Sequence, residues 1–155
     1  PIGMTSMVLG FDAKGAFVGS TYSAATARDW ARFGELFRND GVVNGQRLLP
    51  QGWSDFVASP TRAARIGYGA GFWTNRGDSF GAKARVRMGF TPDSYFASGS
   101  MGQRVIIAPS HGIVIARLGR TADWPDFDIG GAARLLREVV AALSDVGSTR
   151  PGKEQ

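Results

Sequence analysis

The sequence predicts an α+β domain in which an antiparallel β-sheet carries a C-terminal helix on one face and a small helical segment beside it. Apolar segments at about 94–99, 103–108 and 113–118 are separated by short turns, which is typical of neighbouring antiparallel strands. Amphipathic helices are predicted after Thr26 and after Asp128. A chain of 155 residues with 43% hydrophobic and 20% charged residues is long enough to bury a core as one domain.

The first part of the chain combines an irregular segment with a helix. Residues 1–22 are rich in Gly and Ser, and we expect a short strand only at 16–18. A helix begins after Thr26, because its hydroxyl precedes the carboxylate of Asp29 by three residues, the spacing of a capping box. Its inward face repeats at i, i+3 and i+4: Ala27, Trp30, Ala31, Gly34 and Phe37.

A hairpin and a second helix are expected next. The Asn-Gly pair at 44–45 predicts a tight turn within 42–49, because both residue types tolerate positive φ. Pro50 suits the first position of a helix over 50–58. We expect three apolar residues of that helix to face inward: Trp53, Phe56 and Val57.

The second part of the chain has the character of a sheet closed by a helix. A strand is predicted over 68–74, followed by a long polar loop over 75–93. Asp128 can cap the last helix, whose apolar stripe is Ile129, Ala132, Ala133, Leu136, Val140 and Leu143. The tail over 147–155 is expected to be disordered.

The charge pattern indicates no particular partner. The net charge is +5, with small basic clusters at Arg62/Arg65 and Lys83/Arg85/Arg87. Aromatic residues do not alternate with these clusters, so solvated basic loops are favoured over a nucleic-acid surface, and no nucleic-acid partner is expected.

The composition leaves the cellular compartment open. No cysteine is present, which excludes disulfides and thiolate metal sites. No apolar run approaches the roughly 20 residues that span a bilayer. The start at Pro1 lacks an initiator Met and a signal-peptide pattern, so we expect a cut end with any targeting segment upstream.

The candidate site is the small-residue segment Ala97-Ser98-Gly99-Ser100. A Gly-Ser step at a strand edge lets a substrate carbonyl approach the backbone, so that N–H groups can point at a developing negative charge. The alternative is a plain bulge at the sheet edge. Tyr68 could line the same cleft, whereas packing in the core is the alternative for this aromatic side chain.

The sequence holds no activated nucleophile. It contains no Ser-x-x-Lys, no Tyr-x-Asn and no cysteine, and Ser79 has Lys83 four residues on instead of three. The one histidine, His111, lies in a Pro-Ser-His-Gly turn and is interpreted as a solvated turn residue. No metal or cofactor is expected. Three carboxylates near Trp124 indicate a loop and a helix cap because they lack EF-hand spacing: Asp123, Asp126 and Asp128.

Three stretches carry a family resemblance: SAATARDWARFGELFRNDGVVNGQRLLPQGW at 23–53, YGAGFWTN at 68–75 and ASGSMGQRVIIAPSHGIVIARLG at 97–119. Together they resemble the C-terminal half of β-lactamase-related, penicillin-recognising serine hydrolases. The resemblance is greatest to class C β-lactamase-like esterases and 6-aminohexanoate-dimer hydrolases. It implies that residues 1–146 are the C-terminal part of such a domain, with a helical part over 1–60 and the sheet and closing helix over 61–146.

The resemblance also implies roles for the candidate site. In this family the nucleophilic serine and its lysine lie on a helix of the first half, which would be outside this chain. The third motif of the family, Lys-Thr-Gly or His-Thr-Gly, corresponds to Ala97-Ser98-Gly99, and the Ser100 N–H would be an oxyanion donor. Ser98 could bind a polar group of the substrate. Ala97 departs from the usual lysine or histidine, which disfavours a β-lactam carboxylate and favours an ester or an amide.

Two functions remain open at this point. The first is the substrate-cleft half of a serine hydrolase that cleaves a small ester or amide through an acyl-serine intermediate. By itself this chain would be inactive, and its partner would be the N-terminal half of the same enzyme. The alternative is a non-catalytic binding or self-associating module, because an incomplete sheet exposes an unpaired edge and apolar surface.

Overall fold

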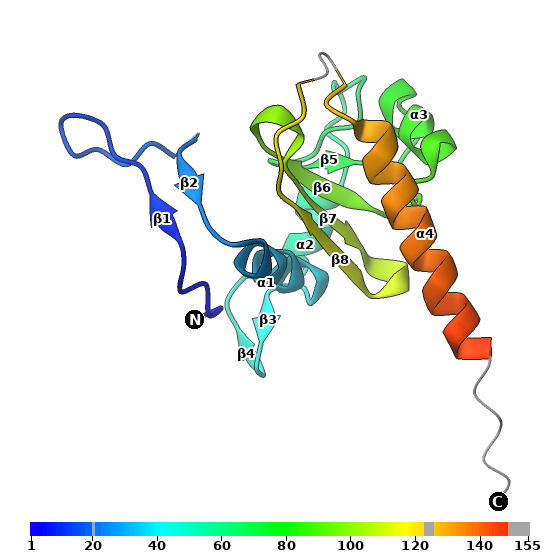
Figure 1. Ribbon diagram of the computed structural model, residues 1–155, viewed down its shortest axis with the longest axis horizontal. Coiled ribbons are helices and arrows are strands. Elements are labelled where there is room, and N and C mark those ends of the chain that lie inside the picture. The colour runs from blue at the N-terminus through cyan, green and yellow to red at the C-terminus, as the bar shows by residue number, and fades with distance from the viewer. Residues whose placement is uncertain (20, 123–125, 149–155) are drawn as a thin grey trace, which may run out of the picture.

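The computed structural model describes residues 1–19, 21–122 and 126–148, and it has the predicted α+β architecture (Figure 1). Four antiparallel strands form the main sheet in the order β5–β6–β7–β8. Their bounds are Trp73–Thr74, Tyr95–Ser98, Arg104–Ala108 and Ile113–Arg117. The three strands predicted between 94 and 118 are therefore confirmed.

The sheet is covered by helices on both faces, so the core has two layers. In β7 all five residues are buried, and successive side chains alternate between the faces. Val105 and Ile107 pack in the cluster with α1 (Ala27–Arg38), whereas Ile106 and Ala108 pack in the cluster with α4 (Ile129–Ser148). The C-terminal helix thus covers one face, as predicted, and the helical segment covers the opposite face.

Helix α1 is fixed at its first turn by residues distant in sequence. Thr26 accepts a hydrogen bond from the Asp29 amide at 3.3 Å, which is one half of the predicted capping box. The other half is not formed, because the Asp29 carboxylate accepts the Ser6 amide at 2.8 Å and also the Ser6 hydroxyl. Further along the helix, Gly34 lets α1 approach the sheet closely, since a Cβ there would overlap the side chain of Val114.

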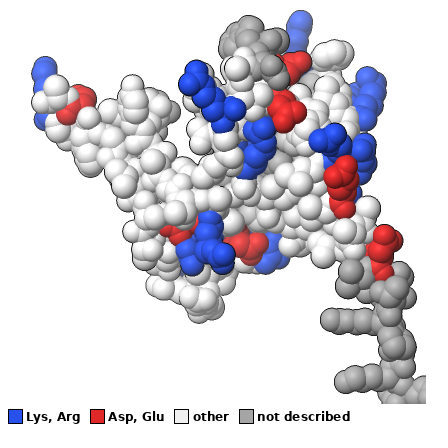
Figure 2. All heavy atoms as spheres, in the orientation of Figure 1, with Lys and Arg blue, Asp and Glu red and all other residues white. Residues whose placement is uncertain are grey.

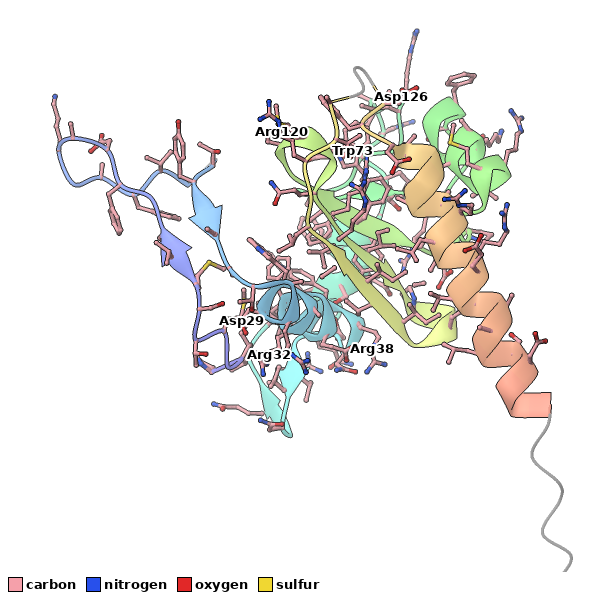
Figure 3. The ribbon with its side chains drawn as sticks, viewed as in Figure 1. Asp29, Arg32, Arg38, Trp73, Arg120 and Asp126 are labelled. Carbon is pink, nitrogen blue, oxygen red and sulfur yellow. The ribbon has the colours of Figure 1, made fainter. Side chains whose placement is uncertain are left out.

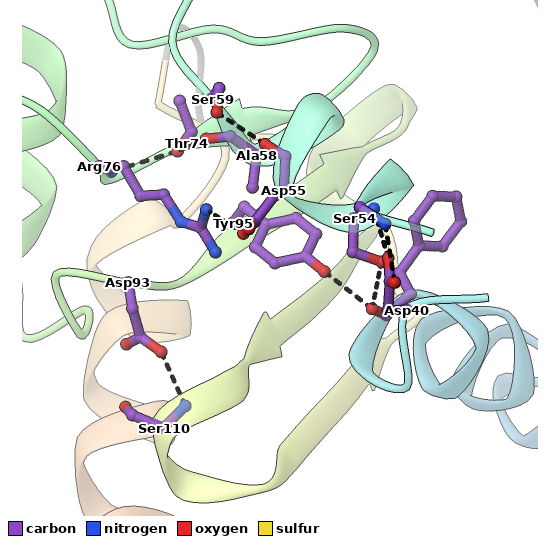
Figure 4. Close-up of polar contacts among 12 residues, drawn as sticks. Asp40, Ser54, Asp55, Ala58, Ser59, Thr74, Arg76, Asp93, Tyr95 and Ser110 are labelled. Atoms are coloured by element: carbon purple, nitrogen blue, oxygen red, sulfur yellow. Dashed lines mark hydrogen bonds and ion pairs between the residues drawn. The ribbon is translucent and has the colours of Figure 1, made fainter. Parts of the chain in front are cut away.

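The hairpin after α1 is confirmed, with β3 (Val42–Val43) paired to β4 (Gln46–Arg47) and positive φ at Asn44 and Gly45. The second helix, α2 (Trp53–Ala58), begins three residues later than predicted. The Asp40 carboxylate causes this, because it accepts the amides of Gly52 and Ser54 at 2.8 and 3.1 Å and so caps the helix at that point (Figure 4).

The inward orientation predicted for Trp53 and Phe56 is wrong. These side chains are 38% and 57% exposed, and their rings pack against each other with centroids 5.2 Å apart. Only Val57 and Ala58 of α2 are buried. A helix of six residues presents one short face to the core, and that face is already occupied by these two residues.

Residues 68–93 depart most from the sequence prediction. The strand expected over 68–74 is limited to Trp73–Thr74, because the chain turns at Gly71, where φ is 87°. The loop expected over 75–93 is wrong, since it contains α3 (Phe80–Met88). Ser79 caps this helix, because its hydroxyl accepts the Ala82 amide at 3.2 Å. The Ser79 hydroxyl thus has a structural role in the helix cap.

Arg85 of α3 is buried, which corrects its assignment to a solvated basic loop. Its guanidinium donates to the Asn75 side chain at 2.6 Å. It also donates to three carbonyl oxygens, those of Ile66, Gly67 and Thr74, at 2.7–3.1 Å. The guanidinium carbon lies 5.6 Å from the ring centroids of both Trp73 and Phe96. Burial lowers the pKa of Arg85, because desolvation disfavours the charged form.

The N-terminal segment forms an arm that projects from the body (Figure 1). The short strand expected at 16–18 is absent, and Phe17 makes only an isolated bridge to Phe11. Instead β1 (Val8–Leu9) pairs with β2 (Ser23–Ala24). Large apolar side chains of the arm are exposed: Val8, Leu9, Phe11, Phe17 and Tyr22.

Helix α4 begins at the predicted cap, where Asp128 accepts the Gly131 amide at 3.0 Å. Ala132, Ala133 and Leu136 are fully buried, whereas Leu143 is 55% exposed, so the predicted apolar stripe ends before it. The helix includes Gly147 and Ser148, which corrects the start of the expected tail; residues 149–155 lie outside the described part of the chain. Within that described part, no helix has the length and apolar character to cross a membrane.

Candidate functional site

The candidate site is built where β6 ends. After Ser98 the chain stays extended at Gly99, with φ −98° and ψ 178°, and then forms a short 3-10 turn over Ser100–Gly102. Met101 and Gly102 have positive φ of 57° and 85°. Gly102 is required there, because a Cβ would lie 2.7 Å from the Phe127 carbonyl oxygen.

Folding of this chain does not require the glycine at position 99. A Cβ there would make only ordinary contacts with Gln103, the nearest at 3.6 Å. The extended φ is also open to any residue. The absence of a side chain at Gly99 therefore leaves free space beside the strand edge, and neither packing nor backbone conformation of this chain requires that space.

Carbonyl oxygens of the turn accept hydrogen bonds, whereas the Ser100 amide donates none among the described residues. The Ser100 carbonyl accepts the Gln103 side-chain amide at 3.3 Å, and the Met101 carbonyl accepts the Thr121 amide at 2.9 Å. Ser100 holds the first position of the turn, where an N–H has no acceptor within the turn. Among the hydrogen bonds of the described residues, none begins at the Ser100 amide.

A cavity of about 450 Å³ opens beside this segment, and Ala97, Ser98, Gly99 and Ser100 all line it. Its volume lies in the range of small-molecule sites. Ala97 is half-buried and the other three are exposed, so the segment forms the rim of a groove and not the interior of the sheet. The structure therefore brings four of the five predicted site residues together.

Tyr68 is the fifth, and the structure does not place it at this cavity. It is half-buried, bridges Trp73, and packs edge-on against that indole ring with centroids 5.3 Å apart. Its role in substrate binding stays a prediction, while its contacts fit the alternative of an aromatic side chain packed beside the core.

Among the other residues that line the cavity are three large apolar or aromatic side chains that were not assigned to it from sequence. Trp30 of α1, Tyr22 of the arm and Leu118 after β8 form its apolar side. Trp30 fits the helical periodicity of a core residue, and nothing in the sequence signals that the arm and the end of β8 line the same cavity. Among the described residues that line the cavity there is no carboxylate, and Arg104 is the one charged residue.

His111 lies in the turn after β7, at the end of the strand remote from the cavity. It is exposed, with its Nδ1 2.8 Å from the Ser110 hydroxyl. Asp93 accepts the Ser110 amide at 2.7 Å (Figure 4). In a serine–histidine–aspartate triad the carboxylate binds the histidine, so this cluster has the wrong order of contacts. The Asp93 carboxylate instead caps the exposed turn that contains Ser110 and His111.

The remaining charged residues form no single surface. On the face shown in Figure 2, basic and acidic side chains lie in several separate groups. Of the carboxylates near position 124, Asp128 caps α4 and pairs with Arg117 at 3.0 Å. Asp123 and Trp124 lie outside the described residues.

No protein-family model matches the chain, and no curated protein matches it. A solved structure described as "Putative 6-aminohexanoate-dimer hydrolase from Bacillus anthracis" matches with a TM-score of 0.66 and 21% sequence identity.

This match covers 88% of our chain and 34% of that protein, so the chain spans about a third of its length. At this level of identity the similarity is one of fold. The chain has the fold of a part of that structure, in agreement with the resemblance to 6-aminohexanoate-dimer hydrolases seen in its sequence.

Proposed function

We propose that this chain forms the substrate cleft of a serine hydrolase that cleaves an ester or an amide through an acyl-serine intermediate. The observation that carries the proposal is the Ser100 amide, which has no acceptor among the described residues and lies at the rim of a 450 Å³ cavity. A backbone donor in this position can stabilise the oxyanion of a tetrahedral intermediate.

The other parts of the rim fit the same chemistry. Gly99 leaves room for a carbonyl group to approach the strand edge, and the Ser98 hydroxyl can bind a second polar group of the substrate. Trp30 and Leu118 offer an apolar wall for the acyl or alcohol part. Because Ala97 carries no charge and no carboxylate is among the described lining residues, a cationic substrate is disfavoured at this rim.

The nucleophile must come from outside this chain. The sequence contains neither Ser-x-x-Lys nor Tyr-x-Asn, and an oxyanion donor accelerates nothing unless a nucleophile is held about 3 Å from the carbonyl carbon. We therefore propose that a further segment of the same enzyme supplies the acyl-accepting serine and its lysine. The described chain would then be inactive by itself.

A second candidate is a non-catalytic module that self-associates or binds another protein. The exposed apolar side chains of the arm favour it, and so does β8, which is an outer strand of the main sheet. In that case the cavity would bind a small molecule without any acyl transfer.

Reconstitution separates the two candidates. The chain is assayed with p-nitrophenyl acetate and a fluorophosphonate probe, alone and with the polypeptide encoded upstream of Pro1 in the same reading frame. We expect hydrolysis and labelling only in the mixture, with the label on the upstream polypeptide. Labelling of this chain alone would reveal a nucleophile of its own. An upstream reading frame without Ser-x-x-Lys, or an inert mixture, would favour the second candidate.

A further inference from the structure

We propose that Arg117, together with Arg104, is a positioning residue that holds the 100–102 turn so that the Ser100 N–H faces the cavity. The inference rests on the proposed function and assigns a role to two arginines that do not touch the reacting atoms. Together these two side chains are called the arginine clamp.

The sheet register brings the two arginines together. Arg104 begins β7 and Arg117 ends β8, and the two are paired neighbours in the ladder. They lie on the face of the sheet that packs against α4, next to the segment that precedes this helix. Both guanidinium groups donate to the same acceptor, the Gly102 carbonyl oxygen, at 3.1 and 2.8 Å.

The clamp also fixes the chain on the far side of the turn. Arg104 donates to the carbonyls of Asp126 and Phe127 at 3.2 and 2.8 Å. Arg117 donates to the Thr121 hydroxyl at 2.9 Å and to the Asp128 carboxylate at 3.0 Å. The Thr121 amide in turn binds the Met101 carbonyl at 2.9 Å. The turn is thus tied to Thr121 and to residues 126–128 through two of its carbonyls.

Stability alone does not explain this arrangement. Arg104 is only 5% exposed, and its Nε has no hydrogen-bond partner among the described residues. Desolvation and then the neighbouring Arg117 lower the pKa of Arg104, which means that its surroundings disfavour the charged form of the guanidinium. Asp128 pairs with Arg117, whereas the side-chain hydrogen bonds of Arg104 go to backbone carbonyls. Buried charges of this kind are weak evidence for stabilisation and better evidence for a fixed geometry.

The turn needs such a restraint. Met101 has a φ of 57°, which is unfavourable for a residue with a Cβ, and the turn is too short to define its own orientation. Because the Met101 carbonyl is bound by Thr121 and the Gly102 carbonyl by the arginine clamp, the first amide of the turn stays fixed at the cavity rim. A displacement of about 1 Å in a catalytic donor can lower a rate about 100-fold.

The test uses Arg117→Met, with Arg120→Met as the matched control. Arg120 is three residues away and exposed, and Figure 3 shows it pointing away from the sheet. Amide hydrogen exchange by NMR is measured on the chain itself. We expect the Gly99 and Thr121 amides, which bind the carbonyls of Gln103 and Met101, to exchange at least about tenfold faster in Arg117→Met, with Ile107 in β7 unchanged.

A purely structural role would instead raise exchange at Gly99, Thr121 and Ile107 alike, and that result would overturn the proposal. In the reconstituted enzyme we expect kcat for p-nitrophenyl acetate to fall about 10- to 100-fold in Arg117→Met, with KM within about twofold.

Arg117→Lys, which can keep one bond to Gly102, should recover part of kcat. An active wild type with an unchanged kcat in Arg117→Met would also overturn the proposal. An inert wild type would sink the proposed function, while the exchange measurement still decides whether the clamp holds the turn.

Discussion

At the scale of single residues, Asp29 shows how a charge is used to fix a local structure. It is 1% exposed in the first turn of α1, where Ser6 and Arg32 bind its two oxygens. Figure 3 shows it facing the N-terminal segment. The hydroxyl and the amide of Ser6, and then Arg32, lower the pKa of this carboxyl below its usual value of 3.8.

This lowered pKa predicts a specific dependence of stability on pH. Because the folded state binds the Asp29 proton more weakly than the unfolded state, the contribution of Asp29 is complete above about pH 5 and is lost as the pH falls through the lowered pKa. We expect Asp29→Asn to unfold at lower urea concentration at pH 7 and to lose part of the acid-side slope. Asp78→Asn, at an exposed position, is the control. Parallel slopes in wild type and Asp29→Asn below pH 4 would contradict this.

Local sequence signals predicted the caps and the turn correctly, whereas contacts between residues distant in sequence could not be predicted. Thr26, Asp128 and the Asn44-Gly45 turn act as predicted, because caps and turns depend on neighbours within four residues. The bond from Ser6 to Asp29 joins residues 23 positions apart, and no local pattern reports it. For the same reason the sequence did not predict that Tyr22, Trp30 and Leu118 line one cavity.

At the scale of elements, α3 depends on one buried cation. Arg85→Met would remove the donor of the Ile66 and Thr74 carbonyls and of the Asn75 side-chain oxygen, whereas the Gly67 carbonyl keeps the Thr74 amide at 3.0 Å. Each buried polar group without a partner costs about 1–3 kcal/mol, so we expect a loss of roughly 3 kcal/mol in the free energy of unfolding. Arg87→Met, on the exposed side of the same helix, should change it by less than about 0.5 kcal/mol. Equal effects in urea unfolding would refute this role of Arg85.

The elements that sequence predicted are those with a clear hydrophobic period. Strands β6–β8 and helices α1 and α4 bury regular apolar patterns, and all five were identified. Helix α3 was missed because its sequence, FGAKARVRM, has no continuous apolar face and is held by the polar contacts of Arg85. The inward side of α2 was misjudged because bulky residues in a six-residue helix need not face the core.

At the scale of the whole molecule, the arm and the body differ in stability. The arm exposes large apolar residues such as Phe11 and Phe17, whereas β7 is buried on both faces. We expect hydrogen–deuterium exchange to be fast over residues 7–19 and slow over 104–108 in the chain alone. Protection of the arm should rise on reconstitution with the upstream polypeptide. An arm that is already protected, together with a dimer in sedimentation, would instead support the self-associating module.

The overall architecture was predictable because the order of elements restricts how they can pack. A helix, strands joined by short turns and a closing helix allow few arrangements, and the solved structure that matches over 88% of the chain has the same fold. The covering of both sheet faces, and the position of the arm and the end of β8 at one cavity, depend on the arrangement of the whole molecule, which a single sequence does not encode locally.

A pair of variants at Ser100 decides whether its amide is an oxyanion donor. Ser100→Pro removes the N–H, while the first position of the turn and the extended Gly99 before it both accept a proline. Ser100→Ala keeps the N–H and removes only the hydroxyl. In the reconstituted enzyme we expect kcat for p-nitrophenyl acetate to fall about 100- to 1,000-fold in Ser100→Pro and little in Ser100→Ala, with similar urea midpoints. Equal activity of the two variants would contradict the account.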